Sequence, residues 1–333
     1  MSYSDEQFMR RCLQLAALGE YYVAPNPMVG AVIVSADGRI IGEGWHRRYG
    51  GPHAEVNAFA SVKSEDEPLL SEATIYVSLE PCSHFGKTPP CADLIVRKGV
   101  KRVVIACLDP NPLVAGNGVR KLREAGIEVE SGIMENEARQ LNKRFFCLHE
   151  KHRPYIILKW AQSADGFIAP LNQQRGERVV FSTPQTKLLV HKMRAENMAI
   201  LVGVNTIISD NPRLLTTHWQ GRNPLRIVLD SHNRIPKDAI VLTDGNPTWV
   251  ITGDTKWESA VKQMAERNIH SVLVEGGAKV LQSVLQSGIY DELHIEINPK
   301  VYLKEGIKAP AVDTLNFDFE ELDGNKLLKF TKI

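Results

Sequence analysis

Three potential metal ligands in the first third of the chain restrict its fold more than any other feature of the sequence. His53 stands in a Pro-His-Ala-Glu segment, Cys82 follows a Glu-Pro pair, and Cys91 follows a proline-rich loop. One imidazole and two thiolates give Zn²⁺ three protein ligands and leave the fourth tetrahedral position to water, as in catalytic zinc sites. Whatever fold the chain adopts must therefore bring these three positions together.

Glu55, two residues after His53, is placed to move protons at such a site. Zinc lowers the pKa of bound water to about neutrality, which supplies hydroxide for attack on an electron-poor ring carbon. A carboxylate that is not a ligand can take the water proton, pass it to a ring nitrogen and later protonate the departing amine. His-x-Glu alone is common by chance, and a lone Cys after Pro is more often a core or loop residue. Because the elements occur together in the order of the zinc deaminases, we predict deamination of a nucleobase-like ring.

The length and charge of the chain limit the number of domains and the kind of partner that we expect. A chain of 333 residues is about twice the usual domain size and predicts two domains. Lys and Arg number 40 against 39 Asp and Glu, which argues against nucleic acid as the partner and favours a small molecule. No apolar run is long enough for a membrane span and no signal-peptide pattern opens the chain, so we expect a cytoplasmic protein. The five cysteines are too few for a disulfide scaffold.

Helix and strand signals alternate through the first 150 residues. The order is typical of a sheet covered by helices on both faces. The expected helices are residues 4–19, from 53, from 92, 118–125 and 135–149, and the expected strands are 30–35, 40–45, 74–79, 102–106 and 127–130.

A hydrophilic stretch, residues 150–154, separates this part from a second βα series, and we place the domain boundary there. Domains 1–150 and 151–333 are predicted, the second also of the α/β class. Its expected strands are 155–160, 199–202, 226–229, 248–251, 271–274 and 292–297, with helices including 183–196 and 258–267.

Several segments of the chain resemble the bifunctional deaminase/reductase family of riboflavin biosynthesis, over essentially the whole length. In the first half these are PNPMVGAV (25–32), GWH (44–46), HAE (53–55) and EPCSHFGKTPPC (80–91). In the second half they are LKWAQSADG (158–166), VGVNT (202–206), SDNP (209–212) and VEGG (274–277).

The resemblance implies a cytidine-deaminase-like three-layer α/β/α domain at the N-terminus. Many nucleoside deaminases have two residues between the thiols, whereas eight separate Cys82 from Cys91 here. His84 and Lys87 in this loop could hold a phosphate or a ring edge beside the metal. Asn26 and His46 would also face the substrate; the alternatives are a turn residue for Asn26 and a surface residue for His46.

For the second half, the resemblance implies a dihydrofolate-reductase-like α/β domain that uses NADPH. The Gly276-Gly277 pair between a strand and an amphipathic helix can offer backbone N–H groups to a phosphate, although most such junctions only make a tight connection. The expected NADPH contacts are Ala161, Thr206, Asp210, Ser231, Gly277, Ala278, Lys279, Val280, Leu281, Gln282 and Ser283. The expected substrate contacts are Lys159, Arg178, Arg194, Leu214 and Glu275.

Two positions depart from the pattern of the reductase half. The family often has Trp where Val180 stands, and Arg where Thr217 and His218 fall. For Arg178 and Arg194 the alternative to phosphate binding is a solvated helix charge. These departures affect two expected contacts, the stacking of a side chain on NADPH and the binding of a phosphate group.

We therefore predict an enzyme with two consecutive sites. The first removes an amine from a diaminopyrimidinone carrying a ribosylamino 5′-phosphate, and the second reduces the ribosyl group to ribityl with NADPH. Lys159 is the candidate that assists opening of the sugar, and the resemblance implies a homo-oligomer formed through the reductase domain. Two rivals remain: a nucleoside or tRNA deaminase fused to an unrelated α/β domain, and a zinc-stabilised binding module without chemistry.

Overall fold

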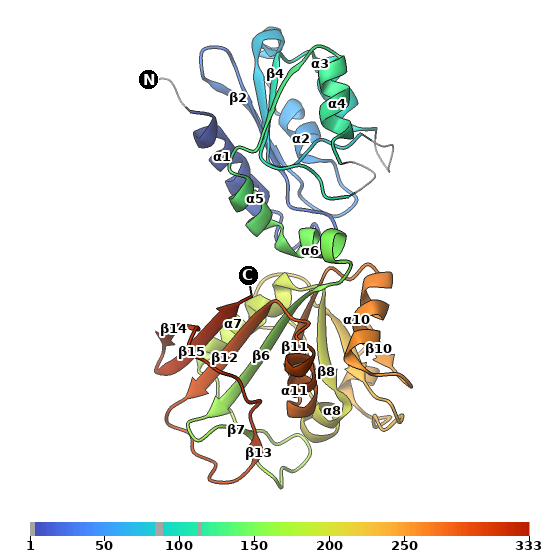
Figure 1. Cartoon of the computed structure of the whole chain (residues 1–333), viewed down its shortest axis with the longest axis vertical. Helices are drawn as coiled ribbons and strands as arrows, with labels where there is room; N and C mark the ends of the chain where they lie inside the picture. Colours follow the sequence, from blue (N-terminus) through green and yellow to red (C-terminus); the bar gives the residue numbers. More distant parts are fainter. Residues whose placement is uncertain (1–3, 84–88, 112–114, 333) are drawn as a thin grey trace. The chain divides into compact units, whose positions relative to one another are not determined.

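The chain forms two compact units in a computed structural model that describes residues 4–83, 89–111 and 115–332 (Figure 1). The first unit is Met1–His152 and the second is Arg153–Ile333. None of the helices in the described ranges has the length and apolar character needed to cross a bilayer.

The first unit is built on a five-stranded sheet. Its strands, in spatial order, are β2 (Ile40–Trp45), β1 (Gly30–Val34), β3 (Thr74–Val77), β4 (Arg102–Ile105) and β5 (Glu128–Ser131). β1 is antiparallel to both β2 and β3, whereas β3, β4 and β5 are parallel. The start of β1 and the ends of β2, β3 and β4 therefore meet at one edge of the sheet. The segment before β1 and the segments after the other three strands lie together at this edge.

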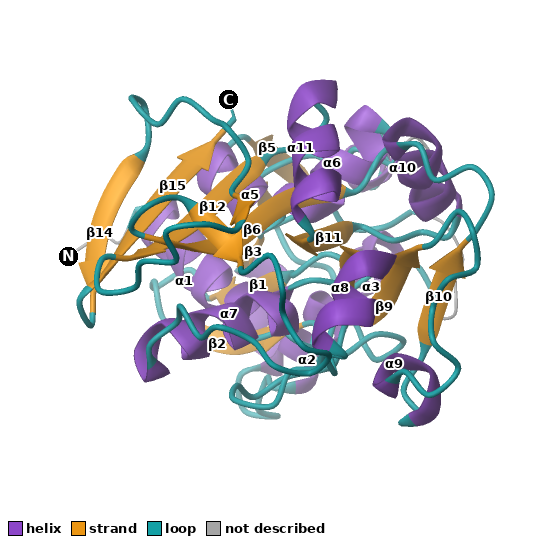
Figure 2. Ribbon diagram, turned by 90° about the horizontal axis from the view of Figure 1, so that it is seen from below, coloured by secondary structure: helices purple, strands orange, loops and turns teal. Residues whose placement is uncertain are grey.

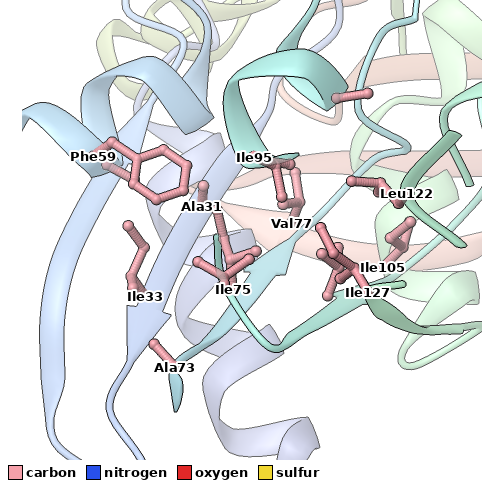
Figure 3. Packing of buried hydrophobic residues seen from close by; sticks show 14 of the residues in the cluster. Ala31, Ile33, Phe59, Ala73, Ile75, Val77, Ile95, Ile105, Leu122 and Ile127 are labelled. Carbon is pink, nitrogen blue, oxygen red and sulfur yellow. The ribbon is translucent and has the colours of Figure 1, made fainter. Parts of the chain in front are cut away.

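Helices cover both faces of this sheet, so the predicted three-layer arrangement is confirmed. α2 (Ala54–Ala60), α3 (Cys91–Lys98) and α4 (Asn117–Glu124) pack on one face through the buried cluster drawn in Figure 3. The alternate side chains of the same strands pack against α1 (Asp5–Ala17), α5 (Glu135–Leu141) and α6 (Lys143–Lys151). A 3₁₀ helix, Glu67–Glu72, precedes β3.

The single helix expected at residues 135–149 is wrong, because the chain breaks into α5 and α6 at Asn142. This residue has φ −104° and ψ 22°. Its buried amide accepts from the Met28 N–H at 2.8 Å and donates to the Met28 carbonyl at 2.9 Å. A side chain that satisfies a distant backbone fixes the turn here, and periodicity along the helix does not reveal that contact.

The second unit contains an eight-stranded sheet. Its strands, in spatial order, are β10 (Thr248–Ile251), β9 (Leu225–Leu229), β8 (Ala199–Gly203), β11 (Ser271–Gly276), β6 (Tyr155–Ser163), β12 (Glu292–Asn298), β15 (Asn325–Thr331) and β14 (Asp318–Leu322). The first six are parallel, and β15 and β14 extend the sheet in antiparallel fashion. The hairpin of β14 and β15 was not expected from the sequence, nor was the small sheet of β7 (Phe167–Ala169) and β13 (Ile307–Lys308).

The strands of the second sheet bury alternate side chains against different helices. α10 (Trp257–Glu266) and α11 (Ala278–Ser287) cover one face, where they pack against strand residues such as Leu201 and Val274. α8 (Val204–Asp210) and α9 (Ile240–Thr243) pack against Ile200 and Val202 on the other face, which α7 (Pro184–Glu196) also covers (Figure 2). The predicted α/β class is confirmed, and the carboxyl ends of six parallel strands form one edge.

Arg226 on β9 is a buried cation that pairs with Asp244, whose side chain is 20% exposed. Its side chain is fully buried, and its guanidinium donates to both Asp244 oxygens at 2.7 and 2.8 Å. It also donates to the carbonyls of Arg213, Val241 and Asn246. Hydrogen bonding to Arg226 lowers the pKa of Asp244 to about 2. Arg226 therefore ties α9 and the segments around Arg213 and Asn246 to β9.

We expect Asp244→Asn to lower the free energy of unfolding of the second unit by about 2–4 kcal/mol near neutral pH, since a buried guanidinium loses its counter-ion. Because the carboxyl pKa lies below its ordinary value of 3.8, the folded state gains stability from ionised Asp244 above that pH and loses it as the pH falls toward 2. Urea unfolding at neutral and acidic pH should show the gap between wild type and variant closing on acidification. Asp238→Asn, at an exposed pair with Arg175, is the control; a gap that stays constant with pH contradicts the assignment.

Candidate functional site

The edge of the first sheet brings the three predicted metal ligands together. His53 Nδ1 lies 3.6 Å from Cys82 Sγ and 3.3 Å from Cys91 Sγ. The ligand atoms of all three residues lie within 4.8 Å of one another. A set of one imidazole and two thiols at this spacing fits a tetrahedral zinc ion with one open position.

Local structure explains why these side chains converge. His53 is the N-cap of α2 and Cys91 is the first residue of α3, while Cys82 lies in the segment after β3. The Cys91 backbone N–H donates to Cys82 Sγ at 3.3 Å, and hydrogen bonds from Cys91 and His53 lower the pKa of the Cys82 thiol. The positive end of α3 also favours thiolates. These contacts stabilise the thiolate of Cys82, whereas the hydrogen bond with Cys82 and burial raise the pKa of the Cys91 thiol.

Glu55 lies in the first turn of α2, where only 3% of its surface is exposed. Burial, and then the neighbouring Cys82 thiolate, raise the pKa of this carboxyl. It lines a cavity of about 320 Å³ that His53 and Cys82 also line. A carboxylate with a raised pKa in such a cavity is suited to alternate between base and acid.

Asn26 and His46, two of the predicted substrate contacts, lie in the lining of the same cavity. Asn26 Nδ2 is 3.1 Å from His46 Nε2, and His46 Nδ1 is 2.9 Å from the Pro52 carbonyl. A carbonyl only accepts, so the geometry assigns the proton to Nδ1 and makes Nε2 the acceptor for Asn26. Burial lowers the pKa of His46. With 3% exposure His46 is not a surface residue, which removes that alternative.

His84 and Lys87, predicted to hold a phosphate or ring edge, lie outside the described residues. Their position relative to the cavity therefore stays a prediction.

Sequence reasoning missed Glu80 as a residue that shapes the site. Its buried carboxylate accepts from four backbone N–H groups at 2.9–3.2 Å, those of Asp109, Gly116, Gly118 and Val119. These contacts fasten the segment after β4 to the segment after β3 that carries Glu80 and Cys82. Tyr49, Asp109, Asn111 and Phe145 complete the polar and aromatic lining. For Asp109 and Asn111 the available signal was the Asp-Pro-Asn-Pro run (109–112) after a buried strand.

A second cavity, of about 600 Å³, lies in the second unit at the carboxyl ends of its parallel strands. All but one of the residues predicted to contact NADPH line it: Ala161, Thr206, Asp210, Ser231, Gly277, Ala278, Lys279, Val280, Leu281 and Ser283. The exception is Gln282, whose Oε1 accepts from the Ala311 N–H at 3.2 Å. Asn205 and Arg234, joined by a hydrogen bond of 2.9 Å, line the cavity and were not predicted.

The glycine junction of this cavity fits a dinucleotide phosphate. Gly276 has φ +139°, a conformation that side chains rarely adopt. At Gly277 a Cβ would lie 3.2 Å from Thr206 Oγ1, and the ten-residue helix α11 begins at the next residue. A bare backbone at the positive end of a helix is a suitable place for phosphate oxygens. The residues present therefore fit the expected cofactor.

Lys159 and Glu275, two of the predicted substrate contacts, line the same cavity. Arg194 instead forms a buried bidentate pair with Glu275, at 2.8 and 2.6 Å, and donates to the Leu215 carbonyl at 3.1 Å. It is thus no solvated helix charge. Its guanidinium lies behind the cavity lining, where it orients Glu275.

Two further substrate predictions also fall outside that lining. Arg178 is exposed, and Leu214 is buried in the cluster around α8 and α9. Of the positions that depart from the family pattern, Val180 is 65% exposed. Thr217 donates its N–H to His191 Nδ1 at 3.1 Å, and the His218 ring lies 4.7 Å from that of His191. The contacts of these residues with ligands stay predictions.

Comparisons with known proteins cover both units. Residues 2–107 match the family model of the cytidine and deoxycytidylate deaminase zinc-binding region, and residues 154–304 match that of the RibD C-terminal domain. The riboflavin biosynthesis protein RibD of Aquifex aeolicus is 42% identical over 91% of this chain and 89% of its own length. That of Escherichia coli K12 is 39% identical over 99% of this chain and 96% of its own length.

Solved structures give the same result. Acinetobacter baumannii RibD superposes with a TM-score of 0.89 at 35% identity, with 98% of both chains covered. A diaminohydroxyphosphoribosylaminopyrimidine deaminase/5-amino-6-(5-phosphoribosylamino)uracil reductase from Thermotoga maritima gives 0.87 at 38% identity, again with 98% of both chains covered.

Proposed function

The chain belongs to the RibD family of riboflavin biosynthesis, and from this premise we propose how its residues divide two reactions between two sites. It is a bifunctional enzyme, a zinc-dependent deaminase and an NADPH-dependent reductase in one polypeptide. The resemblance seen in the sequence is thereby confirmed. A nucleoside or tRNA deaminase with an unrelated second domain is not favoured.

We propose that residues 1–150 carry out the deamination. The observation that supports this most directly is the buried Glu55 carboxylate in the cavity that His53 and Cys82 line. His53, Cys82 and Cys91 would hold the zinc, which would lower the pKa of a water molecule toward neutrality. Glu55 takes a proton from the attacking water, delivers it to a ring nitrogen, and later protonates the amine that leaves as ammonia.

Substrate orientation is the task proposed for Asn26 and His46. Their mutual hydrogen bond holds the His46 ring against the His53 ring, with 5.5 Å between ring centroids. A neutral His46 and an amide offer directional hydrogen-bonding groups to the edge of a pyrimidinone without adding charge. His84 and Lys87 are proposed for the phosphate, because both can donate to its oxygens.

Residues 151–333 are proposed to reduce the ribosyl group. Bound NADPH supplies the hydride. Lys159 donates a proton to the ribose ring oxygen as the bond between C1 and that oxygen breaks, which leaves C1 double-bonded to the exocyclic nitrogen. Addition of the hydride at C1 then gives the ribityl group, so one proton and one hydride are consumed. Lys159 regains its proton from solvent, and the other cavity residues orient the nicotinamide against C1.

The product profile of the whole chain tests both halves together. With the pyrimidinone phosphate alone we expect stoichiometric ammonia release, and with NADPH added we expect equal consumption of NADPH, because the second reaction uses the product of the first. Cytidine, adenosine and tRNA serve as comparison substrates. Ammonia release from these three but not from the pyrimidinone phosphate would refute the assignment, and ammonia without NADPH oxidation would refute the reductase half.

We also propose a cytoplasmic enzyme that acts on a small molecule, not on nucleic acid, and that assembles into homo-oligomers through the reductase domain. The near-equal numbers of basic and acidic residues support the small-molecule substrate. Sedimentation of the full chain and of residues 151–333 alone would locate the interface. A reductase fragment that stays monomeric while the full chain associates would contradict this proposal.

A further inference from the structure

Glu296 on β12 is a buried carboxylate that receives four donors. Its side chain is 2% exposed. Oε2 accepts from Ser182 Oγ at 2.6 Å and lies 3.5 Å from Lys159 Nζ. Oε1 accepts from Thr186 Oγ1 at 2.5 Å and from Asn325 Nδ2 at 2.7 Å. Burial opposes ionisation, yet Lys159 and the three neutral donors hold the pKa of Glu296 below its usual value.

The register of the sheet shows in which direction the Lys159 side chain extends to reach Glu296. β6 and β12 are parallel, and Lys159 stands opposite His294, whereas Glu296 stands opposite Ala161. The carboxylate therefore lies two residues beyond Lys159 along the strands, toward the carboxyl ends where the second cavity opens. To reach Glu296 the Lys159 side chain must extend toward the cavity.

The other carboxylate near Lys159 is already neutralised. Glu275, on β11, binds Arg194 of α7 through two hydrogen bonds of 2.8 and 2.6 Å. Among the described charged and titratable groups that face this region, α7 also presents His191, the pKa of which burial lowers to about 4. This leaves Glu296 as the anion that compensates Lys159, an ammonium with 12% side-chain exposure.

Glu296 does not line the cavity, while Lys159 does. We propose that Glu296 is a positioning residue of the reductase site: it holds the protonated ammonium of Lys159 in the lining of the cavity. Ser182 and Thr186 at the start of α7 and Asn325 on β15 fix the carboxylate by donating hydrogen bonds to it. The inference rests on the proposed role of Lys159 as proton donor. An uncompensated buried ammonium is disfavoured, so the anion also preserves the proton that Lys159 donates.

The test is Glu296→Gln in the full chain, with the deaminated intermediate supplied directly. We expect the reductase kcat to fall about 10- to 100-fold and the alkaline limb of its pH profile to move about one unit or more to lower pH, since the charged ammonium loses its counter-ion. The dissociation constant of NADPH should change less than about twofold. NADPH binding by the same molecules shows that the second unit, which carries Glu296, is folded, and their deamination rate shows that the first unit is folded.

Two matched variants separate positioning from general stability. Glu292→Gln removes another buried carboxylate from the same strand, one bonded to Tyr155 and His294, and should leave the alkaline limb unchanged. Glu296→Asp retains the charge at a greater distance, so its alkaline limb should match wild type and its kcat should fall between those of wild type and Glu296→Gln. If Glu296→Gln does not fold, the aspartate variant decides, because wild-type kcat in it overturns the proposal.

An unshifted alkaline limb in a folded Glu296→Gln protein would also overturn the inference. A different result would show that the proposed role of Lys159 is wrong. In that case Lys159→Met keeps full reductase turnover, whether or not Glu296→Gln lowers it. When both are combined, Glu296→Gln should add no further loss to Lys159→Met, because it acts through that lysine.

Discussion

Glu55→Gln is expected to lower the rate of ammonia release by about 10²- to 10⁴-fold, since the variant loses the group that transfers protons between water, ring and leaving amine. Glutamine fills the same volume at the 3% exposed position in the first turn of α2. Because Glu55 is not in the ligand set of His53, Cys82 and Cys91, the purified variant should keep one zinc per chain. Metal content by mass spectrometry and single-turnover ammonia release provide the measurement.

The same experiment separates an enzyme from a zinc-stabilised binding module. Glu43→Gln is the control, since that carboxylate is paired with Arg11 at the surface, away from the described lining of the cavity. NADPH oxidation with the deaminated intermediate should be normal in both variants. A Glu55→Gln protein that holds zinc and still deaminates at the wild-type rate would refute the mechanism and favour the binding module.

The deaminase site was predictable because its chemistry is concentrated in short motifs. His53 and Glu55 are separated by one residue, and the two cysteines begin or precede regular elements, so sequence order alone suggested how they meet. Asn26 and His46 were predicted from the family resemblance, and the antiparallel pairing of β1 and β2, in which Gly30 stands opposite Trp45, places the segments that carry them side by side. Glu80 was missed because its partners are backbone N–H groups, which carry no sequence signal.

The strands of the parallel sheet were also predictable, since their continuous apolar runs reflect burial on both faces. The hairpin of β14 and β15 was not. Its side chains are mostly exposed, and Lys326 and Lys329 interrupt the apolar positions of β15. The hairpin joins the sheet through the pairing of β15 with β12, and such pairing depends on residues far apart in the sequence.

The reductase site lay between these two cases. Its glycine junction and most cofactor residues followed from the family resemblance, whereas the charge group around Lys159 did not. Lys159 and Glu296 are 137 positions apart, and Asn325 is a further 29 positions along the chain. Contacts of this kind depend on strand order, which composition and periodicity do not encode. Arg194 illustrates how far residue type alone can be interpreted. An arginine suggests an anionic partner, and the sequence predicted a substrate phosphate, whereas the structure pairs Arg194 with Glu275.

Lys159→Met should produce the second large effect, a loss of about 10²- to 10³-fold in reductase kcat, because the ribose ring oxygen loses its proton donor. Methionine preserves the apolar stem on β6 but removes the charge 3.5 Å from Glu296. NADPH affinity should change less than about twofold, since the proposed phosphate contacts lie at the glycine junction and α11. Stopped-flow NADPH oxidation with the deaminated intermediate measures the chemical step.

Lys192→Met is the matched control, because the Lys192 ammonium lies 3.7 Å from Glu196 on α7 and outside the second cavity. It should leave reductase turnover unchanged, and both lysine variants should deaminate at the wild-type rate. Full reductase turnover by Lys159→Met with normal NADPH affinity would remove Lys159 from the mechanism. A loss that appears only as a raised KM for the intermediate would instead make Lys159 a binding residue, because an interaction of equal strength in ground and transition states does not change kcat.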